Sequence, residues 1–266
     1  MIESHKLGRY TVRVWTHGEG RPLLYLHGYE HHPGDAPFLR RLARSRRVIA
    51  PEHPGYGASE GFDALQDITD LVLFYRELLG TFGVGRVDIV GHCFGGMIAA
   101  ELAAFCPELV ERLVLVNAYG LWLDGVDTAD PFSLSPERLR RAKWHDPQNS
   151  PVPEPSLAVA DPSDRIAATI ERSQNLAVAA KFMWPLPDRG LRRRLHLIKA
   201  PSLVIHGTSD GLLPVAHADE FVRLIPNAEY LPVDRAGHLP IIEREKEVCA
   251  AIVNFCSAPE RADHEV

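Results

Sequence analysis

The stretch VDIVGHCFGGMIAAELA, residues 87–103, decides the fold of this chain. It begins as a short β-branched run typical of a buried strand, crosses a glycine-rich turn and continues with helix-forming residues. A sharp strand-to-helix turn of the form G-x-C-x-G holds its central residue in strained geometry, so Gly91 and Gly95 must be small. We therefore expect the Cys93 thiol to stand above a sheet at a helix N-terminus, where free amides favour the reactive thiolate.

Similar apolar runs recur on both sides of this turn and predict further strands. The predicted strands lie at residues 11–16, 23–26, 47–50, 87–90, 113–116, 203–206 and 229–233. Helical patterns lie between most of them, at residues 36–45, 64–80, 94–105, 215–225 and 241–256. The alternation predicts an α/β fold with a mostly parallel central sheet and helices on both faces.

The alternation stops between about residues 119 and 198. We predict a helical cap over residues 119–198, inserted into a core domain made of residues 1–118 and 199–266. The first half should be loop-like because of its prolines, whereas residues 163–183 and 188–198 have helical composition. The prolines are Pro147, Pro151, Pro153, Pro155 and Pro162. The cap also carries Trp122, Trp144 and Trp184, which either pack it onto the core or line an apolar substrate pocket.

Two later loops carry an acid and a base. Asp210 lies in HGTSDGLLP after the next-to-last predicted strand, and His238 lies in DRAGHLP after the last one. Sites of open α/β sheets gather at the carboxyl ends of the strands, so both side chains are expected near Cys93. We predict that Cys93 is a nucleophile, that His238 moves its proton and that Asp210 orients the imidazole. The main-chain N–H of Phe94 is expected to stabilise the oxyanion.

Four blocks of the sequence resemble the α/β-hydrolase superfamily. They are LYLHGYE, PEHPGYGAS, VGHCFGG, and GTSDGLLP together with DRAGHLPIIE. The resemblance implies an α/β-hydrolase fold with its cap after the sixth strand, and a second oxyanion N–H from Tyr29, the residue after the His27-Gly28 pair. This chain departs from most capped members, which have serine where it has Cys93. Cysteine at this turn also occurs in dienelactone hydrolases and polyhydroxyalkanoate synthases, which are similar at the motif only.

The expected activity is cofactor-independent hydrolysis of an ester, thioester or lactone of a small apolar substrate, through an acyl-cysteine. The runner-up is a carbon–carbon hydrolase of the meta-cleavage type. Those enzymes share the cap and the PGYGAS block, but typically have Asn and Trp where this chain has His92 and Leu239. An acyltransferase or cyclase and a serine hydrolase with Cys93 in place of serine stay open. So does a non-enzymatic small-molecule receptor on the same fold.

Composition limits the partners of the protein. The chain has 266 residues and a net charge of -6, from 29 Lys plus Arg against 35 Asp plus Glu, so we expect no nucleic-acid or membrane partner. No apolar run approaches the roughly 18 residues of a membrane span, and a cytoplasmic location is expected. The basic runs at residues 40–47 and 192–194 are interpreted as solvated helix faces. A homodimer formed through the cap stays open.

The remaining polar candidates lie near the proposed pocket. Glu30 and His92 are expected to contact substrate. His31, His32 and Asp35 resemble a metal site only faintly, because a further spaced ligand is missing, so neither a metal nor a cofactor is expected.

Overall fold

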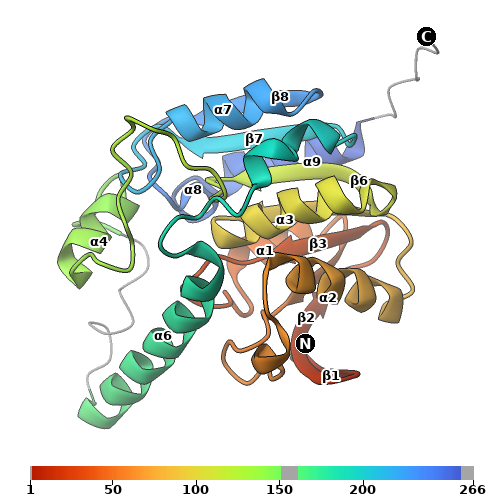
Figure 1. The fold of residues 1–266 in the computed structure, drawn as a ribbon, viewed down its shortest axis with the longest axis horizontal. Helices are drawn as coiled ribbons and strands as arrows, with labels where there is room; N and C mark the ends of the chain where they lie inside the picture. The colour runs from red at the N-terminus through yellow and green to blue at the C-terminus, as the bar shows by residue number, and fades with distance from the viewer. Residues whose placement is uncertain (1, 151–160, 259–266) are drawn as a thin grey trace.

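The computed structural model describes residues 2–150 and 161–258. Within them, eight strands form one sheet in the order β1-β2-β4-β3-β5-β6-β7-β8 (Figure 1). The strands are β1 Ile2–Leu7, β2 Tyr10–His17, β3 Pro22–Leu26, β4 Arg47–Pro51, β5 Val87–His92, β6 Val110–Val116, β7 Ser202–Gly207 and β8 Ala228–Val233. β2 pairs antiparallel with β1 and β4, and the other neighbours are parallel. The α/β-hydrolase fold class is confirmed.

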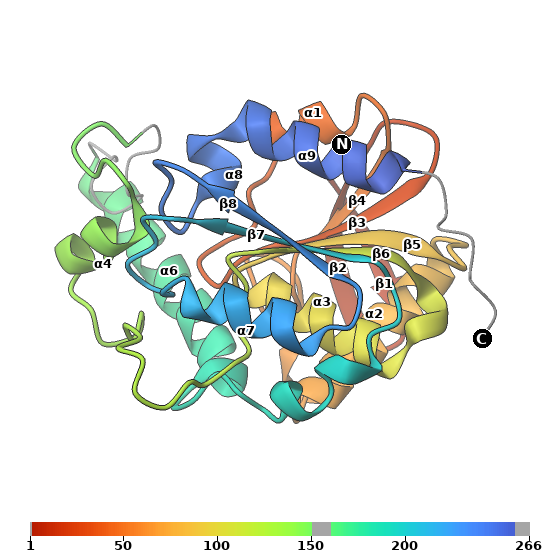
Figure 2. The ribbon, with the colours of Figure 1, turned by 90° about the horizontal axis from the view of Figure 1, so that it is seen from above.

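Helices cover both faces of the sheet (Figure 2). One face carries α1 Pro37–Leu42, α8 Pro240–Glu243 and α9 Glu245–Ser257, and the other carries α2 Ile68–Thr81, α3 Phe94–Phe105 and α7 Ala216–Leu224. The segment between β6 and β7 contains α4 Pro136–Lys143 and α6 Pro162–Met183. Short 3-10 turns are η1 Phe62–Ala64, η2 Pro107–Leu109, η3 Leu191–Arg193 and η4 Leu195–Leu197.

The structure differs from the sequence prediction in four places. The helix predicted over residues 241–256 is divided at Arg244 into α8 and α9. Strand β1 was not predicted because it is an edge strand with mostly exposed side chains. Helix α4 lies in the expected loop-like half of the insert, since its proline occupies the first turn, where no N–H is needed, and Ser135 caps it. Residues 188–198 form the turns η3 and η4 instead of a helix. Pro151, Pro153 and Pro155 lie outside the described residues, and whether residues 119–198 form a domain of their own stays a prediction.

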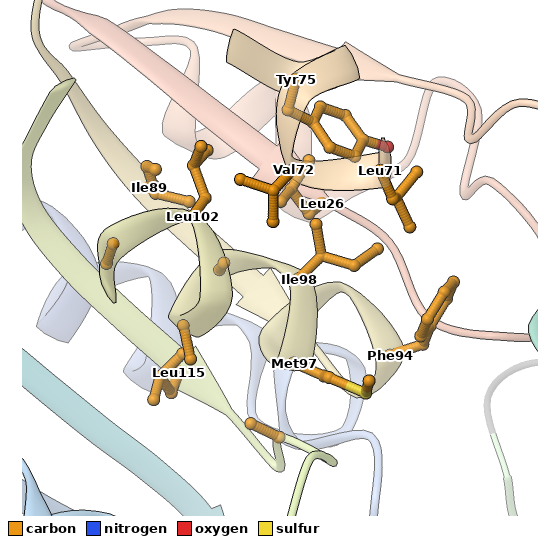
Figure 3. Close-up of a cluster of buried hydrophobic side chains, with 14 of the residues drawn as sticks. Leu26, Leu71, Val72, Tyr75, Ile89, Phe94, Met97, Ile98, Leu102 and Leu115 are labelled. Carbon is orange, nitrogen blue, oxygen red and sulfur yellow. The ribbon is translucent and has the colours of Figure 1, made fainter. Parts of the chain in front are cut away.

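Helix α3 is the centre of the larger hydrophobic core. Its apolar side chains Ile98 and Leu102 lie on the side that faces α2, near Leu71 and Val72, whereas Met97 lies on the side away from α2 (Figure 3). Helix α2 presents a matching stripe at i, i+3, i+4 and i+7, and Asp67 caps its N-terminus by accepting from two main-chain amides. This packing holds the start of α3, and therefore the turn at Cys93, at the carboxyl end of the inner strand β5.

Two arginines of the predicted solvated faces are paired with buried carboxylates. Arg46 is 3% exposed and lies 3.4 Å from Asp88, a buried residue of β5. Arg194 donates two hydrogen bonds to Glu101, which is fully buried on α3. The interpretation of these two residues as solvated was wrong, because both positions meet an acidic partner that is distant in sequence.

Two buried histidines support the loop after β3. The rings of His27 and His53 stack at 3.6 Å, and the His27 Nε2 atom accepts from the main-chain N–H of His53. The other ring nitrogen of His27 is bonded to the oxygen of Gly28, while His53 is bonded to Tyr75. Burial lowers the pKa of His53 to about 3 and that of His27 well below its ordinary value, so both rings stay neutral in the folded protein.

This pair should make folding sensitive to mild acid. Unfolded histidine binds a proton near pH 6.5, whereas the folded rings do not, so the stability that is present above pH 6.5 is lost as pH falls toward 3. Each neutral histidine contributes up to about 1.4 kcal/mol per pH unit in that window. Urea unfolding at pH 7, 6 and 5 should show this decline, and His53→Gln should make it shallower. The exposed His196→Gln serves as the control and should leave the slope unchanged.

Candidate active site

Cys93 lies in a strained turn between β5 and α3. Its φ of 59° and ψ of -118° are unusual for a residue other than glycine. A Cβ on Gly91 would overlap the main chain of Gly95, and a Cβ on Gly95 would overlap the oxygen of Leu26. The main chain of Cys93 donates to the oxygen of Val116 at 2.9 Å, and its own oxygen accepts from Tyr119 at 3.1 Å. The predicted need for glycine around Cys93 thus has a direct steric cause.

Asp210 lies in the loop after β7 with both carboxylate oxygens occupied. Oδ1 accepts from the main-chain amides of Leu212 and Leu213, and Oδ2 accepts from Asn117 at 2.6 Å and from His238 at 2.8 Å. Burial raises the pKa of Asp210, but the charge and hydrogen bond of His238 outweigh it, and the net pKa is lowered. The group is therefore an ionised acceptor that orients the imidazole through Nδ1.

His238 lies between Asp210 and Cys93. Burial lowers the pKa of His238. The Asp210 carboxylate and the nearby Cys93 side chain have the larger, opposite effect, so the net pKa is raised to about 10. The Nε2 atom is buried and has no partner of good hydrogen-bond geometry among the described residues. The raised pKa favours the protonated imidazole of His238 at neutral pH, so that its Nε2 proton lies next to Cys93.

The two main-chain amides that the sequence analysis expects to stabilise an oxyanion belong to segments next to Cys93. Phe94 is the first residue of α3, directly after Cys93. Tyr29 follows Gly28, where a Cβ would lie 3.2 Å from the Cβ and 3.5 Å from the Sγ of Cys93. Neither amide has a hydrogen-bond acceptor among the described residues. Both are free to bind an oxyanion, and the hydrogen bond from Tyr56 to the oxygen of Tyr29 holds that loop.

A cavity of about 90 Å³ lies beside Cys93 and His238. Glu30, His92 and Trp144, which were expected to contact substrate, all line it. Trp122 and Trp184 do not: they are 37% and 55% exposed, so the expectation that they border the pocket is not supported. A single cap tryptophan of the predicted three therefore lies at the site.

Glu30 and His92 each have a protein partner. Glu30 forms an ion pair with Lys143 at 2.9 Å, and the charge of Lys143 helps to lower the pKa of Glu30 despite burial, which raises it. Burial lowers the pKa of His92 to about 4, and its Nε2 donates to the main-chain oxygen of His238 at 2.9 Å. His92 thereby holds the His238 loop.

The C-terminal end of α4 is joined to the same loops. The Lys143 oxygen accepts from the main-chain N–H of His238 at 2.7 Å, and a Cβ on Gly237 would overlap that oxygen. Glu243 accepts from the amides of Gly237 and His145, at 2.6 and 2.9 Å. The inserted segment between β6 and β7 therefore helps to place the His238 loop.

Three residues of the site were not predicted. Asn117 directly follows β6 and holds Asp210, and its place as a polar residue after a buried strand was a usable signal. Tyr119, two residues further on, lies at the same strand end and is one of the large aromatic residues of the insert, whereas Lys143 carries no such signal because its neighbours come from distant parts of the sequence. In the described residues no group of three or more His, Cys, Asp or Glu side chains is placed to hold a metal ion. The described helices include none that is long and apolar enough to cross a membrane.

Comparison with known proteins identifies the family of the chain. The model of the alpha/beta hydrolase family matches residues 23–251, and the chain belongs to that family. It is 28% identical to a 2-hydroxymuconate semialdehyde hydrolase of Pseudomonas putida, over 95% of each chain.

Two solved structures share the fold. A membrane phospholipase A has a TM-score of 0.79 and 23% identity, over 96% of this chain and 85% of that one. A meta-cleavage product hydrolase from Pseudomonas fluorescens IP01 has a TM-score of 0.74 and 20% identity, over 95% of this chain and 96% of that one. At these identities the likeness concerns the fold alone.

The role of Asn117 can be tested by Asn117→Ala. The change removes one donor to Asp210 and the acceptor of the Gly207 amide, so the free energy of unfolding should fall by about 1 to 3 kcal/mol. Looser orientation of His238 should lower kcat about tenfold or more on any substrate that is turned over. Urea unfolding and steady-state kinetics measure both effects. Asn227→Ala, at an exposed amide, is the matched control, and equal effects from the two variants would contradict the assignment.

Proposed function

We propose that this protein hydrolyses a carbonyl substrate, an ester, thioester or lactone, through an acyl-cysteine formed on Cys93. The observation that carries the proposal is the arrangement of His238, whose Nδ1 is bonded to Asp210 at 2.8 Å and whose other interacting neighbour is the buried Cys93 side chain. The family supports hydrolytic chemistry in general. Cys93 is the proposed nucleophile, His238 the acid and base, Asp210 the orienting group, and Tyr29 and Phe94 the oxyanion donors.

The first half-reaction forms the thioester. The thiolate of Cys93 attacks the carbonyl carbon, and the carbonyl oxygen becomes an oxyanion held by the amides of Tyr29 and Phe94. The bond to the leaving group then breaks, and the Nε2 proton of His238 passes to the leaving oxygen or sulfur. A raised pKa suits this step, because the imidazole is protonated before the substrate binds.

The second half-reaction needs the neutral form of the His238 imidazole. Acylation removes the negative charge of Cys93, one of the two groups that raise the pKa of His238. The imidazole is then neutral after giving up its proton and takes one from water. The hydroxide attacks the thioester, the C–S bond breaks, and the carboxylic acid leaves as Cys93 regains its thiolate and His238 its proton.

An activated ester tests both half-reactions together. Mixing the protein with 4-nitrophenyl butyrate should give sustained release of nitrophenol with little gain in intact mass. Cys93→Ala should lower release by about three orders of magnitude and show no acyl adduct. A burst of one equivalent with a stable adduct would indicate acyl transfer to another acceptor, the open alternative. Nitrophenol release no faster than that of Cys93→Ala, together with no gain in intact mass, would overturn the role of Cys93.

Replacement by serine separates a true cysteine enzyme from a drifted serine enzyme. A serine hydroxyl is far less acidic than a thiol and must lose its proton during the attack, a general-base step that a thiolate does not need. We therefore expect Cys93→Ser to lower the acylation rate about tenfold or more. Pre-steady-state release of nitrophenol measures this rate, and faster release by the serine variant would favour the drifted-enzyme alternative.

A second candidate is cleavage of a carbon–carbon bond next to a ketone. It is favoured by the Pseudomonas putida relative, a 2-hydroxymuconate semialdehyde hydrolase that matches nearly the whole chain. The positions of His92 and Leu239 speak against it, since neither supplies the amide and indole groups typical of that class. Absorbance decay of 2-hydroxymuconate semialdehyde, compared with butyrate ester hydrolysis at equal protein, should favour the ester by kcat/KM.

A further inference from the structure

Several buried polar atoms near Cys93 have no hydrogen-bond partner. Among the described residues these are the hydroxyls of Tyr29 and Tyr119, the indole Nε1 of Trp144 and the Nε2 of His238; the others belong to Arg46, Asp88 and Asn175. Tyr29 and Tyr119 are each 2% exposed and Trp144 is 4% exposed. Buried polar groups are rarely left unpaired in a folded protein, so a cluster of them requires an explanation.

The three side chains come from separate parts of the chain and lie close to Cys93 or His238, although Tyr119 is not among the residues that line the cavity there. Tyr29 follows β3, Tyr119 follows β6, and Trp144 directly follows α4. Tyr29 and Trp144 both line the cavity that contains Cys93 and His238. The ring of Tyr119 lies 5.7 Å from that of His238 and 6.2 Å from that of Tyr29.

Other buried tyrosines of the same core do have hydrogen-bond partners for their hydroxyls. The Tyr56 hydroxyl donates to the oxygen of Tyr29 at 3.0 Å, and the Tyr75 hydroxyl is bonded to His53. Phenylalanine would fill the places of Tyr29 and Tyr119 without an unpaired hydroxyl. Packing alone therefore does not account for the two phenols beside Cys93.

The chemistry of the cluster points to an acceptor. The Trp144 Nε1 can only donate a hydrogen bond. Burial, followed by the nearby negative groups, raises the pKa of Tyr29 and Tyr119 well above the ordinary value of phenols, so both remain protonated donors. The neighbouring charges of Lys143 and Glu30 are already paired with each other. The cluster thus offers uncharged donors to an oxygen atom that the protein itself does not supply.

We propose that Tyr29, Tyr119 and Trp144 bind a second oxygen on the acyl part of the substrate, a keto oxygen or a carboxylate beyond the carbonyl that reacts. This inference rests on the proposed function at Cys93. The acyl part of the substrate stays bound during both acylation and hydrolysis. Donors that bind it can therefore orient the substrate in both half-reactions. The preferred substrates are then oxygenated acyl compounds, and plain fatty acyl esters are poor ones.

Matched esters test the preference. The 4-nitrophenyl esters of hexanoate, 5-oxohexanoate and adipate differ in the second oxygen, which is absent, neutral or charged. The protein should prefer one oxygenated ester to the plain one by at least tenfold in kcat/KM. Tyr29→Phe and Tyr119→Phe should each reduce that ratio about tenfold, mainly through KM. Tyr75→Phe, whose hydroxyl is bonded elsewhere, should leave the ratio unchanged. The keto and adipate arms show which oxygen is preferred.

Stability and binding exclude the alternatives. Tyr29→Phe and Tyr119→Phe should leave the unfolding midpoint unchanged or raised; a clear fall would show that the hydroxyls have structural partners, and would overturn the proposal. Calorimetry with Cys93→Ala should show that 5-oxohexanoate or adipate binds more tightly than hexanoate, and that Tyr119→Phe in this background removes the difference. This result supports the proposal even if Cys93 turns over no ester. Equal binding of all three acids would overturn it.

Discussion

The positive φ of Cys93 is the constraint on which the rest of the site depends. A side chain in this conformation persists only where the surrounding packing leaves no alternative. Here β5 ends and α3 begins within one residue, the flanking glycines leave no room for Cβ atoms, and the main chain of Cys93 is bonded to Val116 and Tyr119. The same turn places the sulfur at the N-terminus of α3, next to main-chain amides that have no partner within the helix.

Around that turn Asp210 and His238 are held by polar contacts at the carboxyl ends of neighbouring strands. Asn117 from the end of β6 bonds to Asp210 after β7, and Asp210 bonds to His238 after β8. Helix α4 contributes its last main-chain oxygen to the His238 loop. The inserted segment is thus part of the machinery that positions the base, in addition to its contribution to the cavity wall through Trp144.

Sulfur changes what this network must do. A serine nucleophile must lose its proton during the attack, whereas a thiolate does not, and the raised pKa of His238 favours a protonated imidazole next to Cys93. The unpaired phenols of Tyr29 and Tyr119 add a second chemical demand on the ligand. The carbonyl that is attacked and the second oxygen of the substrate would then bind at neighbouring positions beside Cys93.

The sequence by itself determined the fold class, the strand-to-helix turn at Cys93 and the positions of Asp210 and His238, because these depend on local periodicity, glycine spacing and strand ends. It did not reveal β1, which is mostly exposed, or α4, whose proline occupies the first turn of the helix, where it removes no hydrogen bond. Only the tertiary structure decided that Arg46 and Arg194 are paired, that Trp144 alone of the cap tryptophans borders the cavity, and that Tyr29 and Tyr119 are left unpaired. Such outcomes depend on contacts between residues that are distant in the chain, and the spacing of residues in the sequence does not predict these contacts.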